Sequence, residues 1–75
     1  MPLNQVPIGQ TVTILRIEGE RSFRRRLLEL GLLPGTRVRV LRVAPLGDPL
    51  ELWLRNAHLS IRAAEAEKIF VQEAE

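Results

Sequence analysis

Residues 24–36 read RRRLLELGLLPGT, so that three adjacent arginines precede a run of leucines and a Leu-Pro-Gly turn. Phe23, Leu27 and Leu30 fall at i, i+4 and i+7, the spacing of one face of a helix, and we expect this face to pack on the core. Gly31 predicts where the helix ends, because glycine readily adopts the left-handed conformation that caps helix C-termini. This stretch therefore predicts a single short amphipathic helix.

The arginines of this helix lie off its apolar face. At about 100° per residue, Arg21 and the three adjacent arginines form the solvated side. Leu28 projects among them. It is either an exposed apolar contact point for a partner or a partly covered residue at the flank of the helix, and the sequence leaves both interpretations open.

The rest of the chain predicts short strands separated by tight turns. In the second strand the valines change phase after Val40, which predicts a bulge or a sharp bend. In the third, alternating leucines predict an inner face, and Trp53 looks outward. Asn56 and Ala57 are expected to form a tight turn in which Asn56 adopts a positive φ. The expected strands are 11–17, 36–43, 50–55, 59–61 and 69–72, with one helical turn at 63–68 before the last of them.

The predicted fold class is mainly β with one short helix, in the order β-α-β-β-β-β. Short strands, tight turns and one helix in 75 residues favour a small, strongly bent barrel with the helix at one open end. We expect a single domain over residues 1–75, with an ordered core from about Leu3 to about Gln72 and a frayed tail.

The charge is distributed unevenly along the chain. The formal net charge is +2, but residues 16–42 hold eight arginines against three glutamates, a local excess of +5, whereas residues 43–75 carry −3. Such a surface orients an encounter with an acidic partner, yet it lacks the interleaved aromatics of most single-strand binders. We therefore expect no nucleic-acid partner. The alternative hypothesis is a small barrel that binds nucleic acid through Arg37, Arg39 and Arg42.

The sequence shows no set of residues typical of a catalytic site and no nucleotide-binding loop. There is no cysteine, His58 is the single histidine, and no serine or threonine stands at a fixed spacing from a base. We predict that the chain is not an enzyme. His58, beside a turn, is interpreted as a surface residue and only as a weak metal candidate. Asp48, before a proline, is an oxygen ligand in one interpretation and bonds its own backbone in the other.

The N-terminal residues, MPLNQVPIGQ, show no positively charged leader, and no window reaches the roughly 18 apolar residues of a membrane span. The absence of cysteine gives no reason to expect an oxidising compartment. We expect a soluble, cytoplasmic protein that does not insert into the membrane.

Several of these segments together resemble one known family. RRRLLELGLLPGT followed by VRV, then APLGDPLEL, LSIR and EAEKIFV are similar to the FeoA family, small cytoplasmic accessory proteins of bacterial ferrous iron uptake. The resemblance covers nearly the whole chain. It implies an SH3-like β-barrel and a partner, the membrane transporter FeoB, whose cytoplasmic part includes a GTP-binding domain. It also implies recruitment to the inner membrane through that partner. Because a lone histidine without cysteines offers few metal ligands, we expect no cofactor. The alternative function is a stand-alone metal-sensing module that binds iron or another divalent ion weakly through His58 and nearby carboxylates.

A docking surface for this partner is expected where apolar residues are left over from the core and lie near arginines. We assign the turn at 45–49 to this surface, because two prolines stiffen the turn and it therefore loses little entropy on binding. For Leu32 and Leu33 the alternative is that they seal the helix against the barrel mouth. The predicted partner-binding residues are Arg24, Arg25, Leu28, Leu32, Leu33, Pro34, Leu46 and Asp48.

Overall fold

The computed structural model describes residues 1–74, and its elements follow the predicted order. These elements are η1 (Leu3–Gln5), β1 (Thr11–Ile17), α1 (Arg21–Glu29), β2 (Arg37–Val43), β3 (Leu50–Leu54), β4 (Ala57–Ile61), α2 (Ala63–Ala66) and β5 (Ile69–Glu73). The expected helical turn before the last strand is α2. The 3-10 helix η1 has no counterpart among the predicted elements.

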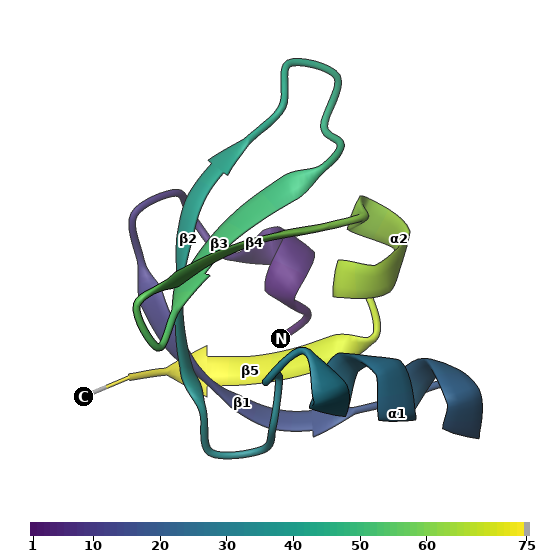
Figure 1. Ribbon diagram of the computed structural model, residues 1–75. Coiled ribbons are helices and arrows are strands. Elements are labelled where there is room, and N and C mark those ends of the chain that lie inside the picture. Colours follow the sequence, from purple (N-terminus) through teal and green to yellow (C-terminus); the bar gives the residue numbers. More distant parts are fainter. Residues whose placement is uncertain (75) are drawn as a thin grey trace.

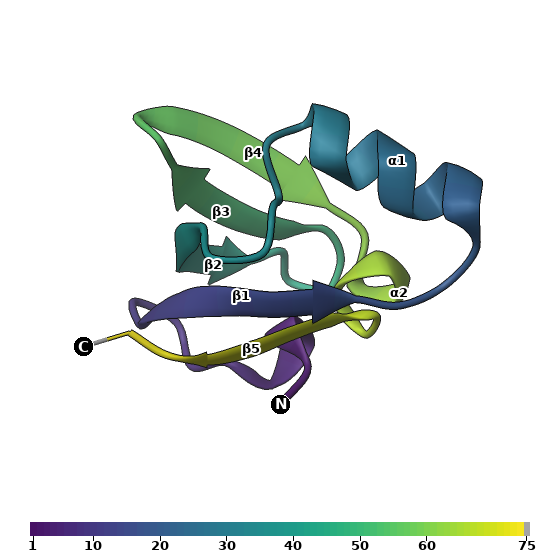
Figure 2. The same ribbon diagram turned by 90° about the horizontal axis from the view of Figure 1, so that it is seen from below.

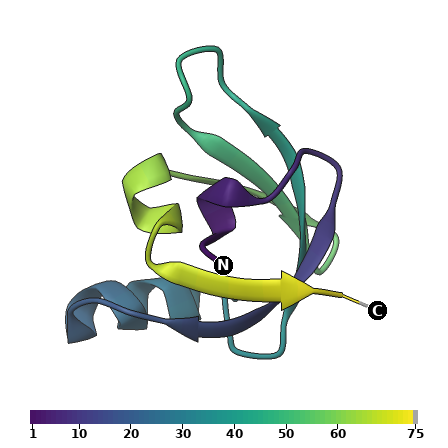
Figure 3. The ribbon, with the colours of Figure 1, turned by 180° about the vertical axis from the view of Figure 1, so that it is seen from behind.

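The five strands form one antiparallel sheet in the order β4-β3-β2-β1-β5, which curls around the core (Figure 1). In the described part of the chain the edge strands β4 and β5 do not pair with each other, so the expected barrel is an open, strongly curved sheet. The two short helices α2 and η1 lie in the space between these edges (Figure 3). They cover the side that further strand pairing would close.

Irregular pairing bends two of the strands. The register between β2 and β3 shifts between Val40 and Arg42, at the point where the valines change phase, so the predicted bulge is confirmed. A second shift lies in β1, between Ile14 and Arg16, against β5. A bulge adds a residue to one strand and increases its twist locally, and these two irregularities help the small sheet to curl.

The core fills the inside of the curved sheet. The predicted inner face of β3 is confirmed, because its alternate leucines are buried while Trp53 points outward. The fully or nearly buried apolar residues are Leu3, Val6, Val12, Ile14, Leu27, Leu32, Val38, Val40, Leu50, Leu52, Leu54, Ile61, Ala66, Ile69 and Val71. None of the helices within residues 1–74 has the length and apolar character needed to cross a membrane.

Helix α1 lies beside the sheet, where the chain leaves β1, and it ends as the glycine predicts (Figure 2). Gly31 has a φ of +96°. Its N–H donates to the carbonyl of Leu28, and the N–H of Leu32 donates to that of Leu27, both over 3.0 Å. These two bonds make a Schellman motif, which turns the chain back toward the core.

This turn corrects two expectations about the leucines around it. Leu30 is 45% exposed instead of core-facing, because the helix ends at Glu29 and the chain then changes direction. Leu32 is 0% exposed instead of available to a partner, because the Schellman motif points the residue after the glycine inward. Leu32 thus seals the helix against the sheet and is removed from the candidate binding residues.

The turn between β3 and β4 lies one residue earlier than predicted. Arg55 and Asn56 have φ values of 49° and 61°, and Leu54 pairs with Ala57 across them. Two consecutive positive φ values are those of a type I′ turn, whose twist matches the twist of the flanking strands. The expected positive φ of Asn56 is confirmed, whereas Ala57 is the first residue of β4, and His58 follows it on that strand.

Candidate functional site

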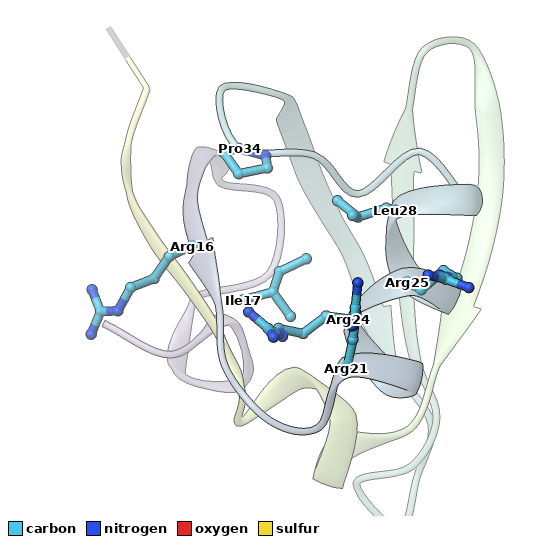
Figure 4. Close-up of a pocket in the computed structure, with 7 residues that line it drawn as sticks. All are labelled: Arg16, Ile17, Arg21, Arg24, Arg25, Leu28 and Pro34. Carbon is cyan, nitrogen blue, oxygen red and sulfur yellow. The ribbon is translucent and has the colours of Figure 1, made fainter.

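A groove of about 430 Å³ lies between the end of β1, the helix α1 and the turn at 33–36. We call it the basic groove. Its lining residues are Arg16, Ile17, Arg21, Arg24, Arg25, Leu28 and Pro34. Figure 4 shows Arg21 and Arg24 projecting from the helix on the side of Ile17, whereas Arg16 points away from them.

The helical period places four of these residues along one side of α1. Arg21, Arg24, Arg25 and Leu28 stand at i, i+3, i+4 and i+7. The core-facing side of the same helix carries Leu27, which is completely buried, together with a partly buried phenylalanine one turn earlier. Burial of that side therefore directs the arginine and leucine stripe into the groove.

The opposite wall is held in place by hydrogen bonds between a turn and a strand. The N–H of Thr36 donates to the carbonyl of Leu33 over 3.0 Å, with Pro34 and Gly35 at the centre of the turn, as the Pro-Gly pair predicts. Gly35 also donates to the carbonyl of Ile14 over 2.7 Å, which binds the turn to β1. Pro34 is thereby fixed beside the strand that supplies the floor of the groove.

The groove combines positive charge with an apolar floor. Arg16 is neutralised by Glu18, at 2.9 Å between Nε and Oε2, and its guanidinium lies 4.3 Å from the centre of the Phe70 ring. Within residues 1–74, no carboxylate pairs with the other three arginines of the groove. The site therefore presents three uncompensated guanidinium groups next to exposed aliphatic surface.

The predicted partner-binding residues divide between two places. Arg24, Arg25, Leu28 and Pro34 come together in the basic groove, and Leu33, which is half-buried, is the first residue of the turn that forms one wall. Leu46 and Asp48 lie outside the groove, in the turn between β2 and β3 (Figure 1).

The β2–β3 turn is anchored by Asp48. Its Oδ1 accepts a hydrogen bond from the N–H of Ala63 at 2.9 Å, so this carboxylate bonds the start of α2 rather than its own backbone. Leu46 is 97% exposed at the tip of the turn. Asp48 therefore has a structural contact, whereas Leu46 stands alone as an exposed leucine.

Arg16, Ile17 and Arg21 line the groove and are absent from the sequence-based set of binding residues. The signal for Arg21 is present in the sequence, since it stands seven residues before Leu28 on the same helical side. Arg16 and Ile17 come from β1, and their proximity to the helix follows from the tertiary fold and not from any local spacing.

A second polar cluster covers the outer face of the sheet. His58 Nε2 lies 2.8 Å from Glu51 Oε1, and the Nε of Arg42 donates to Glu51 Oε2. The hydrogen bond from Arg42 lowers the pKa of Glu51 from its usual value, and burial opposes this shift. Among residues 1–74, no group of three or more acidic, histidine or cysteine side chains is arranged to hold a metal ion. His58 is exposed and is paired with a carboxylate that Arg42 already engages.

The chain matches a family model over most of its length. Residues 1–73 match the model described as the FeoA domain. The chain is also 36% identical over 72 residues to the Fe(2+) transport protein A/Fe(2+) transporter FeoB fusion protein of Porphyromonas gingivalis. That match covers 96% of the chain and 8% of the fusion protein, so the chain spans only a small part of this relative.

Solved structures share the fold. The FeoA protein from Chlorobium tepidum is 39% identical with a TM-score of 0.93, over 100% of this chain and 71% of that one. The FeoA of Stenotrophomonas maltophilia in complex with zinc, named as a procaryotic SH3 domain protein, is 26% identical with a TM-score of 0.81, over 96% and 89% of the two chains. A manganese-dependent transcriptional repressor, 21% identical with a TM-score of 0.89 over 99% of this chain and 41% of its own, shares the fold alone. The chain therefore belongs to the FeoA family and has the SH3-like fold that its sequence motifs imply.

Proposed function

We propose that this chain is a non-catalytic accessory domain of ferrous iron uptake, which binds the cytoplasmic portion of the FeoB transporter and modulates it. The observation that carries the proposal is the relative in which a FeoA domain and the FeoB transporter form one polypeptide. A covalent link raises the effective concentration of one module at the other, which supports two modules that act together. In the proposed setting the chain is cytoplasmic and reaches the membrane through its partner.

The non-catalytic part of the proposal is supported by the environment of the single histidine. His58 pairs with Glu51, which could orient it as a base, but within residues 1–74 no hydroxyl group is hydrogen-bonded to it. A nucleophile and its base need to lie within hydrogen-bond reach. We also propose that the chain has no resident cofactor and no nucleic-acid substrate. A purified chain that hydrolyses GTP by itself above a buffer blank would contradict this part.

The binding part is tested by calorimetric titration of the chain with the cytoplasmic portion of FeoB from the same organism. We expect a saturable heat of binding. A matched control is the SH3-like domain of a metal-dependent repressor, which has the same fold and only about a fifth of the residues in common. A heat no larger than that of the control would remove the proposed partner.

A further inference from the structure

We infer that the basic groove binds an acidic segment of the transporter's cytoplasmic portion, which inserts one apolar side chain between Leu28 and Pro34 and pairs its carboxylates with the surrounding arginines. The inference rests on the proposed function and names the chemistry by which the partner would be recognised. Three features of the groove carry it: its unpaired charge, its apolar floor and its lack of aromatic surface.

Four arginines line the groove, and one of them has a carboxylate partner. Arg16, which lines the groove, and Arg26 and Arg42, which lie outside it, pair with glutamates. The other arginines of the groove are Arg21, Arg24 and Arg25, and among residues 1–74 they have no carboxylate partner. Like charges at i, i+3 and i+4 destabilise a helix. An acidic ligand would relieve this repulsion, and its approach would be steered by the local field.

The floor of the groove provides an anchor for an apolar side chain. Leu28 is 42% exposed, Ile17 is half-buried and Pro34 is exposed and conformationally fixed. Interfaces concentrate their binding energy in a few apolar anchors that are surrounded by polar groups, and this groove has that arrangement. Because helix and turn hydrogen bonds hold the walls, the backbone of the groove is preformed and loses little entropy on binding.

The aromatic side chains argue against a single-stranded nucleic acid in this groove. Such ligands gain affinity by stacking their bases on aromatic rings. Phe23 and Phe70 are already covered by cations, with Lys68 Nζ 5.1 Å from the Phe23 centroid and Arg16 over Phe70. Trp53 lies on the outer face of β3, outside the groove.

The orientation of α1 argues against a membrane surface as the ligand. A helix that lies on a bilayer buries its apolar face in the lipid interface. The apolar face of α1 carries Leu27 and Phe23, and it is packed into the core of the domain. What remains outside is a concave, arginine-rich side with a single leucine, which fits an acidic chain better than a flat lipid surface.

The test uses four single variants in a calorimetric titration with the cytoplasmic portion of FeoB. Arg24→Glu and Leu28→Ser change the groove. Arg39→Glu and Leu30→Ser are matched controls, because these residues are exposed, have the same types and lie outside it. We expect each groove variant to raise Kd by about tenfold or more and each control by less than about twofold. Binding of the wild type should also weaken as salt is raised, since exposed charges are screened. Thermal melting confirms that each variant is folded.

The outcomes separate this inference from the proposed function. If the wild type binds and all four variants bind equally well, the groove inference is overturned and the proposed function stands. If the wild type does not bind, the acidic segment does not belong to the transporter. The groove is then tested by titration with a short peptide that carries glutamates around one leucine. Amide shifts in NMR spectra confined to the groove would support the recognition chemistry, and their absence would overturn it. Tighter, Arg24-dependent binding of a DNA oligonucleotide or of phosphatidylserine vesicles would overturn it as well.

Discussion

The backbone N–H of Leu32 donates to the carbonyl oxygen of Leu27 over 3.0 Å, across the left-handed residue Gly31, and both leucine side chains are completely buried. This relationship ends α1 and returns the chain to the core. It also decides which leucines are left outside. Leu28 stays exposed on the arginine side of the helix, and the chain continues into the turn that places Pro34 opposite to it.

Replacement of Gly31 tests the cap directly. A Cβ at this position would meet only Leu54 Cδ1 at 3.8 Å, so there is space for it, and the penalty comes from the backbone conformation. We expect Gly31→Ala to lower the free energy of unfolding by about 1 kcal/mol, measured by urea denaturation. The exposed helix position Ser22→Ala serves as the control. An unchanged midpoint in Gly31→Ala would show that α1 does not end in a left-handed cap.

The two neighbouring leucines should differ sharply in their contribution to stability. Leu32→Ala leaves a cavity in the core and should lower the free energy of unfolding by about 2–5 kcal/mol. Leu28→Ala changes an exposed side chain and should cost less than about 0.5 kcal/mol. Equal losses for the two variants, in the same denaturation assay, would contradict the division between a sealing leucine and a groove leucine.

The sequence predicts the elements of this fold better than it predicts which side chains meet. The helix end, the bulge after Val40 and the inner face of β3 follow from local rules, namely the left-handed preference of glycine and the alternation of side chains along a strand. The burial of Leu32 and the exposure of Leu30 depend on a chain reversal that periodicity does not encode. A regular helical period extended past Gly31 assigns both residues to the wrong side.

The same limit applies to the candidate site. The stripe that links Arg21 to Leu28 could be read from the helical period, but its juxtaposition with Ile17 depends on how β1 leads into α1. The outer-face cluster was likewise hidden, since Glu51 alternates with buried leucines and is itself largely covered through its pairing with Arg42 and His58.

Glu51 gives the fold a defined response to acid. Its pKa lies below the usual range, chiefly because Arg42 donates a hydrogen bond to the carboxylate. A carboxyl group with a lower pKa in the folded state stabilises the fold above its unfolded value of about 4.3, and this stabilisation is lost as the pH falls through the folded pKa. We expect the wild type to lose stability below about pH 4 more steeply than Glu51→Gln does. Arg42→Gln, which removes the cause, should have the same flatter profile, and parallel profiles for all three proteins would contradict the assignment.

We expect the purified chain to contain no stoichiometric metal ion. His58 has one carboxylate neighbour, Glu51, and the other oxygen of that carboxylate is engaged by Arg42. A stable site for a transition metal needs more ligands than this pair supplies. Elemental analysis should give the same low metal content for the wild type and for His58→Ala. One iron or zinc per chain, lost in His58→Ala, would establish the metal site that the geometry argues against.

Ferrous iron uptake by cells is the most direct test of the central claim, an accessory domain that acts on the transporter through its basic groove. The host strain lacking this chain is complemented with the wild type, with Arg24→Glu or with Arg39→Glu, and uptake of radioactive ferrous ion is measured at equal protein levels. We predict that the wild type and Arg39→Glu restore uptake, whereas Arg24→Glu leaves it close to that of the deletion strain. Uptake that is the same with and without the chain, or fully restored by Arg24→Glu, would contradict the claim.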